Sequence, residues 1–231
     1  MGDIHGRLIA FDLDGTVIDS RRDLTNSANE LVLELGGEPL SEAAVAGMVG
    51  EGAALLVRRV LAAAGLPDQP EALARFLDIY DTRLLQHTVP YEGIVDALQV
   101  ARAYARVTLL TNKPLHATSR ILDGLGLAAL FDEVIGGDGP YPRKPDPSSL
   151  LAMMTRAGAT PERTLLVGDS AIDRDTARRA GVRCCLVSYG FGRPTLDRAP
   201  ESDAEWTIAE AARLPEVIEA FYGSCARNGS S

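Results

Sequence analysis

The amino-acid sequence predicts an α/β fold in which a parallel β-sheet core carries one inserted helical domain. Two observations predict it. Short, continuously apolar runs recur along the chain with helix-like segments between them, and residues 20–88 interrupt this alternation with helical patterns alone. Apolar runs of this length are typical of strands that are buried on both faces. Such strands pair in parallel through right-handed crossovers that contain a helix.

Five apolar runs are candidate strands, and three of them end at a polar residue. Asp12 follows the first of these three, Thr111 the second and Asp169 the third. Ligands of parallel sheets bind beyond the carboxyl ends of the strands, so we expect these three residues at one edge of the sheet. The five runs are 8–11, 107–110, 134–135, 165–168 and 184–187.

The helical segment has apolar residues spaced by three and four positions in three stretches. Glycine and proline stand at the ends of these stretches, as is typical of helix termini. We therefore predict a core domain made of residues 1–19 and 89–231 and an inserted helical domain of residues 20–88. The return over residues 89–93 is the expected hinge.

The composition limits which classes of partner the protein can bind and indicates its cellular compartment. The chain has 231 residues and a formal net charge of −9, which disfavours binding to nucleic acid and to anionic membranes. Cys184 and Cys185 lie in an apolar run, and with Cys225 they indicate core residues in a reducing compartment and not a disulfide framework. Because apolar runs fall far short of the ~20 residues of a membrane span and a signal-peptide pattern is not visible, we expect a cytoplasmic protein.

The run Asp12-Leu13-Asp14-Gly15-Thr16 carries the strongest chemical signal. Residues two apart in a strand point the same way, so Asp12 and Asp14 can face one pocket. Two carboxylates there repel each other unless a cation lies between them, and Mg²⁺ prefers such oxygen ligands. One carboxylate can also attack phosphorus while the other protonates the leaving oxygen. Gly15 lets main-chain amides approach an anion closely.

Three later groups each have an ordinary structural explanation when taken alone. Thr111-Asn112-Lys113 can hold a phosphate oxygen or cap a helix. Lys144, before Pro145, can neutralise a phosphoryl group or simply be solvated. Asp169 and Asp173 can bind a cation or complement a helix dipole. Their expected convergence at one sheet edge favours the chemical interpretation.

With these residues together, the chain resembles the haloacid dehalogenase superfamily of phosphatases over nearly its whole length. The resemblance implies a Rossmann-like parallel core with a helical cap between the first and second motifs. The four motifs stand in order as Asp12-Leu13-Asp14-Gly15-Thr16, Thr111-Asn112, Lys144-Pro145, and Gly168-Asp169 with Asp173.

The resemblance also implies a role for each motif residue. Asp12 would be the nucleophile that forms an aspartyl-phosphate, and Asp14 the general acid and base. Mg²⁺ would be held by the carboxylates of Asp12 and Asp169 and the main-chain carbonyl of Asp14, while Asp173 supports its water shell. Lys144 would act both in catalysis and in phosphate binding. The phosphate-binding set would be Leu13, Gly15, Thr111, Asn112 and Lys144.

Within the superfamily, the chain is most similar to the phosphoglycolate phosphatase family. This resemblance implies 2-phosphoglycolate as substrate and a glycine-containing cap loop, with Gly50 and Gly52, that lies over the site. Arg58 and Arg83 are candidate cations for a substrate carboxylate, but cap arginines are more often solvated and we assign neither. The segments that carry the resemblance are 11–20, 48–53, 136–138, 143–147 and 188–190.

Other functions stay open at this point. A phosphomutase acting on a sugar phosphate would share the nucleophile and the metal, and relatives with the same core hydrolyse other small esters or pyrophosphate. A non-catalytic protein that binds a phosphorylated ligand would not need both Asp12 and Asp14. A nucleotide-binding dehydrogenase is disfavoured because no Gly-x-Gly-x-x-Gly follows the first strand. The expected partner is a small phosphorylated metabolite, bound by a monomer or a homodimer.

Overall fold

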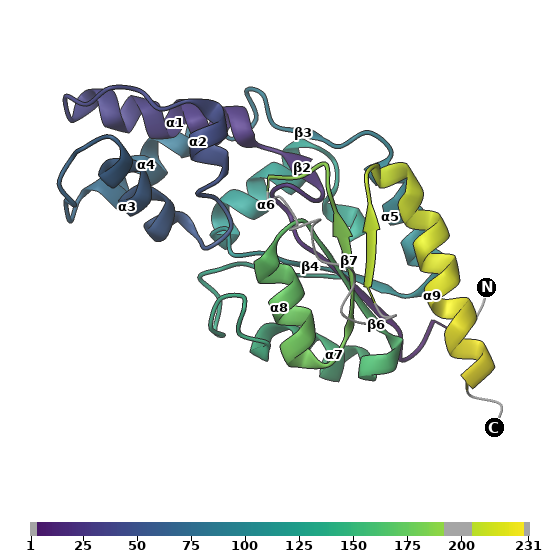
Figure 1. Ribbon diagram of the computed structural model, residues 1–231. Coiled ribbons are helices and arrows are strands. Elements are labelled where there is room, and N and C mark those ends of the chain that lie inside the picture. The colour runs from purple at the N-terminus through teal and green to yellow at the C-terminus, as the bar shows by residue number, and fades with distance from the viewer. Residues whose placement is uncertain (1–3, 192–204, 229–231) are drawn as a thin grey trace.

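A six-stranded parallel sheet forms the core of the computed structural model, which describes residues 4–191 and 205–228 (Figure 1). All five predicted runs are strands of this sheet. Among the described residues, every helix is too short or too polar to cross a membrane. The strands, in spatial order, are β5 (Glu133–Ile135), β4 (Arg106–Leu110), β1 (Leu8–Phe11), β6 (Thr164–Gly168), β7 (Arg183–Val187) and β8 (Glu205–Ile208).

Strand β1 shows why these runs are continuously apolar. Ile9 and Phe11 pack in one apolar cluster, whereas Leu8 and Ala10 pack in a second. Alternate side chains of a strand point to opposite faces, so the sheet has a hydrophobic core on each side. The first core includes residues of α5 (Ile94–Tyr104), α6 (Leu115–Gly124) and α9 (Leu214–Asn228), and the second residues of α7 (Ser148–Ala157) and α8 (Ala171–Ala180).

Strand β8 is the element that the sequence pattern did not predict. It is an edge strand that pairs only with β7. Its Trp206, to which the sequence assigned no role, packs edge-on against Phe221 with ring centroids 6.1 Å apart. An edge strand has one neighbour and less burial, so its hydrophobic signal is weak. The predicted core positions Cys184 and Cys185 are buried in β7, while the Cys225 side chain lies outside the described part.

Residues 20–88 contain four helices that lie together to one side of the sheet (Figure 1). Both ends of this segment meet in a two-stranded antiparallel ribbon, in which β2 (Ile18–Asp19) pairs with β3 (Val89–Pro90). The short second helix was not expected as a separate element. The helices are α1 (Arg21–Glu34), α2 (Glu42–Ala46), α3 (Ala53–Ala63) and α4 (Ala72–Asp81).

A buried carboxylate ties the start of this segment to its end. Asp23, in the first turn of α1, is fully buried. Its Oδ2 accepts hydrogen bonds of 2.8 Å from the main-chain N–H groups of His87 and Thr88 and from the Thr88 hydroxyl. Buried N–H groups must find acceptors, so Asp23 holds the returning chain beside α1.

Replacing this carboxylate should destabilise the protein. Asp23→Ala leaves three donors, two of them on the buried Thr88, without their acceptor, and we expect the free energy of unfolding to fall by about 2–3 kcal/mol. Urea unfolding measures the change. Asp123→Ala, which removes an exposed carboxylate from α6, is the matched control. Equal unfolding midpoints for the two variants would contradict this role for Asp23.

Candidate active site

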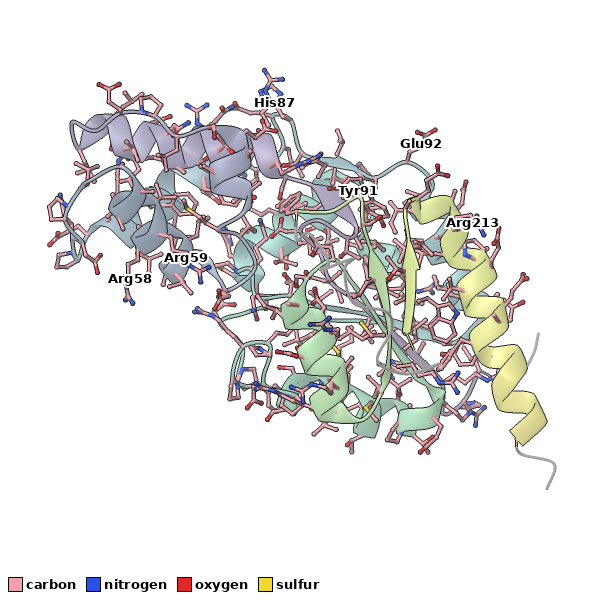
Figure 2. The ribbon with its side chains drawn as sticks, in the orientation of Figure 1. Arg58, Arg59, His87, Tyr91, Glu92 and Arg213 are labelled. Atoms are coloured by element: carbon pink, nitrogen blue, oxygen red, sulfur yellow. The ribbon has the colours of Figure 1, made fainter. Side chains whose placement is uncertain are left out.

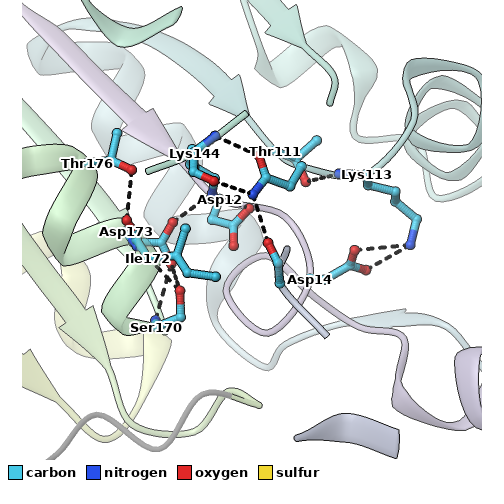
Figure 3. Close-up of polar contacts among 11 residues, drawn as sticks. Asp12, Asp14, Thr111, Lys113, Lys144, Ser170, Ile172, Asp173 and Thr176 are labelled. Carbon is cyan, nitrogen blue, oxygen red and sulfur yellow. Dashed lines mark hydrogen bonds and ion pairs between the residues drawn. The ribbon is translucent and has the colours of Figure 1, made fainter. Parts of the chain in front are cut away.

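Three strand ends meet at the carboxyl edge of the sheet. Asp12 follows β1, Thr111 follows β4 and Asp169 follows β6, and β1 lies between the other two strands. Figure 3 shows Asp12 and Thr111 at this edge, together with Lys144. The Asp12 N–H donates to the carbonyl of Val167 at 2.9 Å, which continues the β1–β6 pairing. The parallel topology thus brings together residues that lie far apart in the chain, at the edge that the sequence indicated.

Lys144 lies between two carboxylates. Its Nζ is 2.8 Å from Asp12 Oδ1 and 2.6 Å from Asp173 Oδ1, and its side chain is only 2% exposed. Burial opposes the charge of the ammonium, but the two carboxylates outweigh it and hold the pKa of Lys144 above its usual range. Burial raises the pKa of Asp12 to about 7, Lys144 opposes this rise and Asp173 adds to it. Lys144 therefore supplies positive charge directly beside Asp12.

A cluster of three buried carboxylates surrounds this edge. One carboxylate oxygen each from Asp12, Asp169 and Asp173 lies within 4.8 Å of the others. Lys144 is the lysine that contacts this cluster, so negative charge remains in excess. Hard oxygen ligands in such an arrangement suit a divalent cation. The residues present therefore fit the metal that the family resemblance implies.

Two glycines allow the main chain to pass close to the Asp169 carboxylate. A Cβ added to Gly15, whose φ is +85°, would lie 2.2 Å from Asp169 Oδ2, and one added to Gly190 would lie 2.4 Å from it. The same oxygen accepts a 2.7 Å hydrogen bond from the Phe191 N–H. The chain can thus fold closely around this carboxylate only with glycine at both positions.

Asp14 points to a different partner. Lys113 Nζ is 3.0 Å from both carboxylate oxygens of Asp14, and the Ser20 hydroxyl donates to Oδ1 at 2.5 Å. The sequence argument expected Asp12 and Asp14 to share one cation. The structure instead gives each its own lysine, because β1 ends at Phe11 and strand alternation does not continue through the turn that follows. A metal contact from Asp14 would come from its main chain, as the resemblance implies.

Asn112 connects two loops at the site. Its Nδ2 donates to the carbonyls of Lys144 at 2.9 Å and Gly50 at 2.8 Å, and its Oδ1 accepts from the Lys144 N–H at 2.9 Å. The neighbouring Thr111 hydroxyl accepts from the Lys113 N–H at 3.2 Å. The Asn112 side chain therefore holds the lysine loop and the loop after α2, and its main chain is the part left to face an anion.

A pocket of about 550 Å³, its open mouth included, lies between this edge and the inserted helices. Asp12, Asp14, Thr111 and Lys113 line it from the core. The glycine-containing loop expected over the site lines it too, with Gly50 and Gly52. The inserted segment adds a mainly apolar wall formed by Leu24, Val49, Leu56, Phe76, Leu77 and Tyr80.

The two arginines considered from sequence lie elsewhere. Arg58 pairs with Asp68 at 3.5 Å, and both side chains are exposed; Figure 2 shows Arg58 pointing away from the core. Arg83 pairs with Glu30. Lys113 and Tyr80, in contrast, line the pocket without having been singled out. The sequence could have indicated Lys113, because it belongs to the Thr111-Asn112-Lys113 run at a predicted strand end. Tyr80 could not be found in this way, because it stood out only as one of the regularly spaced apolar positions of a predicted helix.

Comparison with known proteins agrees with this geometry. Residues 9–187 match the haloacid dehalogenase-like hydrolase family. Phosphoglycolate phosphatase of Pseudomonas putida is 42% identical over 203 residues, which cover 84% of this chain and 74% of that protein. Phosphoglycolate phosphatase of Cereibacter sphaeroides is 40% identical, over 83% of this chain and 89% of that protein.

Solved structures show the same architecture. A structure described as a predicted phosphoglycolate phosphatase from Haemophilus somnus superposes with a TM-score of 0.82 and 26% identity, covering 94% of this chain and 99% of that one. The match to the family over most of the chain, together with relatives at about 40% identity, shows that this protein belongs to the haloacid dehalogenase-like hydrolases.

Proposed function

We propose that this protein is a Mg²⁺-dependent phosphatase that hydrolyses 2-phosphoglycolate through an aspartyl-phosphate on Asp12. The observation that carries the proposal is the Asp12 carboxylate on the floor of a pocket, 2.8 Å from Lys144 and beside two further carboxylates. Phosphoglycolate phosphatases at about 40% identity support the choice of substrate.

The chemistry divides between the two aspartates of the first motif. Asp12 attacks the phosphorus in line with the ester oxygen, and Lys144 offsets the charge that accumulates there. Asp14 protonates the leaving oxygen, and afterwards takes a proton from the water that hydrolyses the acyl phosphate. The separate lysine partners keep the two carboxylates apart, so each can perform its own step. Leu13, Gly15, Thr111 and Asn112 are the proposed phosphate-binding positions, through their main chain or hydroxyl.

The proposed metal ligands are Asp12, Asp169 and the Asp14 carbonyl. When bound, Mg²⁺ would offset negative charge on the transferring phosphoryl group. Asp173 holds Lys144 and also accepts from the Ser170 hydroxyl at 2.6 Å, so its orientation is fixed by the α8 capping box. That arrangement suits a supporting role beside the metal better than direct ligation.

Residues 20–88 are proposed to act as a cap that closes over the substrate. Both chain crossings lie in the β2–β3 ribbon, and the Gly50 carbonyl accepts from Asn112 across the boundary. Closure would exclude water while the phosphoryl group is transferred. We further propose the cytoplasm as the compartment, on the basis of the cysteine usage.

A substrate panel tests the function directly. Phosphate release is measured from 2-phosphoglycolate, sugar phosphates, nucleotides and pyrophosphate, with Mg²⁺ and with excess chelator. We expect chelator-sensitive release with a clear preference for 2-phosphoglycolate. Preference for another compound would replace the proposed substrate. Absence of release from all of them would contradict a phosphatase and make a mutase assay, with a bisphosphate activator, the next measurement.

The nucleophile is tested by Asp12→Asn. The amide cannot form the acyl phosphate, so we expect kcat to fall by about 10⁴-fold or more while the fold is retained. Circular dichroism checks the fold, and Asp123→Asn at an exposed site is the control. Substantial turnover by a well-folded Asp12→Asn protein would rule out this mechanism.

The metal site is tested by Asp169→Asn. Loss of one carboxylate ligand should raise the Mg²⁺ concentration needed for half-maximal activity by at least about tenfold. The titration is followed by phosphate release. Partial recovery at high Mg²⁺ separates weakened metal binding from misfolding. An unchanged Mg²⁺ dependence would show that Asp169 is not a ligand.

A further inference from the structure

One wall of the pocket combines a buried cation with a buried hydroxyl. Among the lining residues that the structure describes, Lys113 is the only cation. It comes from the core, directly after Asn112, whereas Tyr80 comes from α4 of the inserted segment. Apart from Asp12, Asp14 and this pair, most of the lining is apolar or small. A ligand with a second anionic group would find its counter-charge here.

Lys113 has one donor that Asp14 does not use and that lies beside Tyr80. Its side chain is 4% exposed, and its Nζ lies 3.0 Å from each oxygen of Asp14. An ammonium group carries three N–H donors, so two contacts with Asp14 leave one. The Nζ also lies 4.6 Å from the centroid of the Tyr80 ring, over its face. Burial opposes its charge, but Asp14 and Tyr80 together outweigh burial and hold the pKa of Lys113 above its usual range.

Tyr80 presents the second donor. The residue is 3% exposed, and its buried hydroxyl has Lys113 beside it and no other hydrogen-bond partner among the described residues. Burial raises the pKa of Tyr80 to about 12, so the hydroxyl keeps its proton. Buried hydroxyls normally donate a hydrogen bond, and one that lines a pocket and has no acceptor in the structure can donate to a ligand. Lys113 lies next to it, so both donors can address one group.

We propose that Lys113 and the Tyr80 hydroxyl bind the carboxylate on the leaving-group side of the substrate. The proposal rests on the proposed function and deepens it by naming the residues that select the substrate. In 2-phosphoglycolate a single methylene separates the carboxylate from the ester oxygen. Asp14 has to reach that oxygen, and Lys113 contacts Asp14, so the carboxylate of a bound substrate lies close to Lys113.

This subsite explains selection for a small acidic ester. A phosphoester without the carboxylate would leave two buried donors unpaired, and sites built to bind a polar group strongly reject analogues that lack it. The apolar wall of Leu56, Phe76 and Leu77 would in turn disfavour the hydroxyl-rich body of a sugar phosphate. The cap therefore selects through Tyr80 and its apolar side chains, and the core selects through Lys113.

The test compares 2-phosphoglycolate with ethyl phosphate, in which a methyl group replaces the carboxylate. For Lys113→Met, we expect the ratio of kcat/KM for the two esters to fall about 10- to 100-fold, mainly through KM for 2-phosphoglycolate. Tyr80→Phe should lower the same ratio about threefold to tenfold. If Lys113 acts only by positioning Asp14, both esters lose activity equally and the ratio stays the same, which would overturn the subsite. An unchanged ratio in Tyr80→Phe would overturn the tyrosine's part.

Tyr91→Phe is the matched control for the tyrosine. The Tyr91 hydroxyl is also buried without a partner among the described residues. Tyr91, labelled in Figure 2, follows β3, packs at a tilt against Tyr189 and does not line the pocket. Its removal should leave the ratio of kcat/KM values unchanged. A fall equal to that of Tyr80→Phe would show that any buried tyrosine hydroxyl has this effect.

A binding measurement separates failure of the subsite from failure of the proposed function. Lys113 and Lys144 are the only lysines in the sequence, so ¹⁵N-lysine labelling gives two side-chain Nζ signals. In the Asp12→Asn protein, 2-phosphoglycolate should shift the Lys113 signal and ethyl phosphate should not. Equal shifts with both esters would overturn the subsite. If the wild-type protein releases no phosphate from either ester, the function fails, and these spectra still decide the subsite.

Discussion

Buried negative charge at the carboxyl edge of the sheet is the constraint on which the rest of the site depends. Asp12, Asp169 and Asp173 are almost fully buried and lie close together. A charge that is removed from water is costly unless it is paired. The position of Lys144 between Asp12 and Asp173 lowers this cost, because its ammonium pairs with both carboxylates. The excess of negative charge over the single Lys144 ammonium makes this edge suitable for a divalent cation.

The distribution of cations follows from the same constraint. The sequence has 23 basic residues, and Lys113 and Lys144 are the only lysines among them. Described arginines such as Arg58 and Arg75 make their ion pairs on exposed surface. A compact ammonium fits between closely spaced buried carboxylates, whereas the larger planar guanidinium would need more room. Each lysine takes one aspartate of the first motif, which keeps the two carboxylates apart.

The sequence predicted the sheet because its central strands are buried on both faces and therefore read as unbroken apolar runs. It missed β8, an edge strand whose flanking sequence is charged, and it did not predict α2 as a separate helix. It predicted which strand ends converge, because parallel strands share an edge. It could not predict where the Asp14 carboxylate points, since that depends on the turn after β1 and on Lys113, 99 residues away. The sequence could not predict that Tyr80 lines the pocket either, because its contact with Lys113 joins residues that lie far apart in the chain.

Asn112 shows how the charged core and the inserted segment are coupled. Its side chain holds the main chain of Lys144 through two hydrogen bonds and reaches the inserted segment through one, at Gly50. Of these three hydrogen bonds, movement of the inserted segment away from the core would break only the one to Gly50, and Lys144 would stay beside Asp12. It would, however, carry Tyr80 away from Lys113. The arrangement of charge at the site therefore belongs to the core, whereas the surroundings of Lys113 depend on where the inserted helices lie.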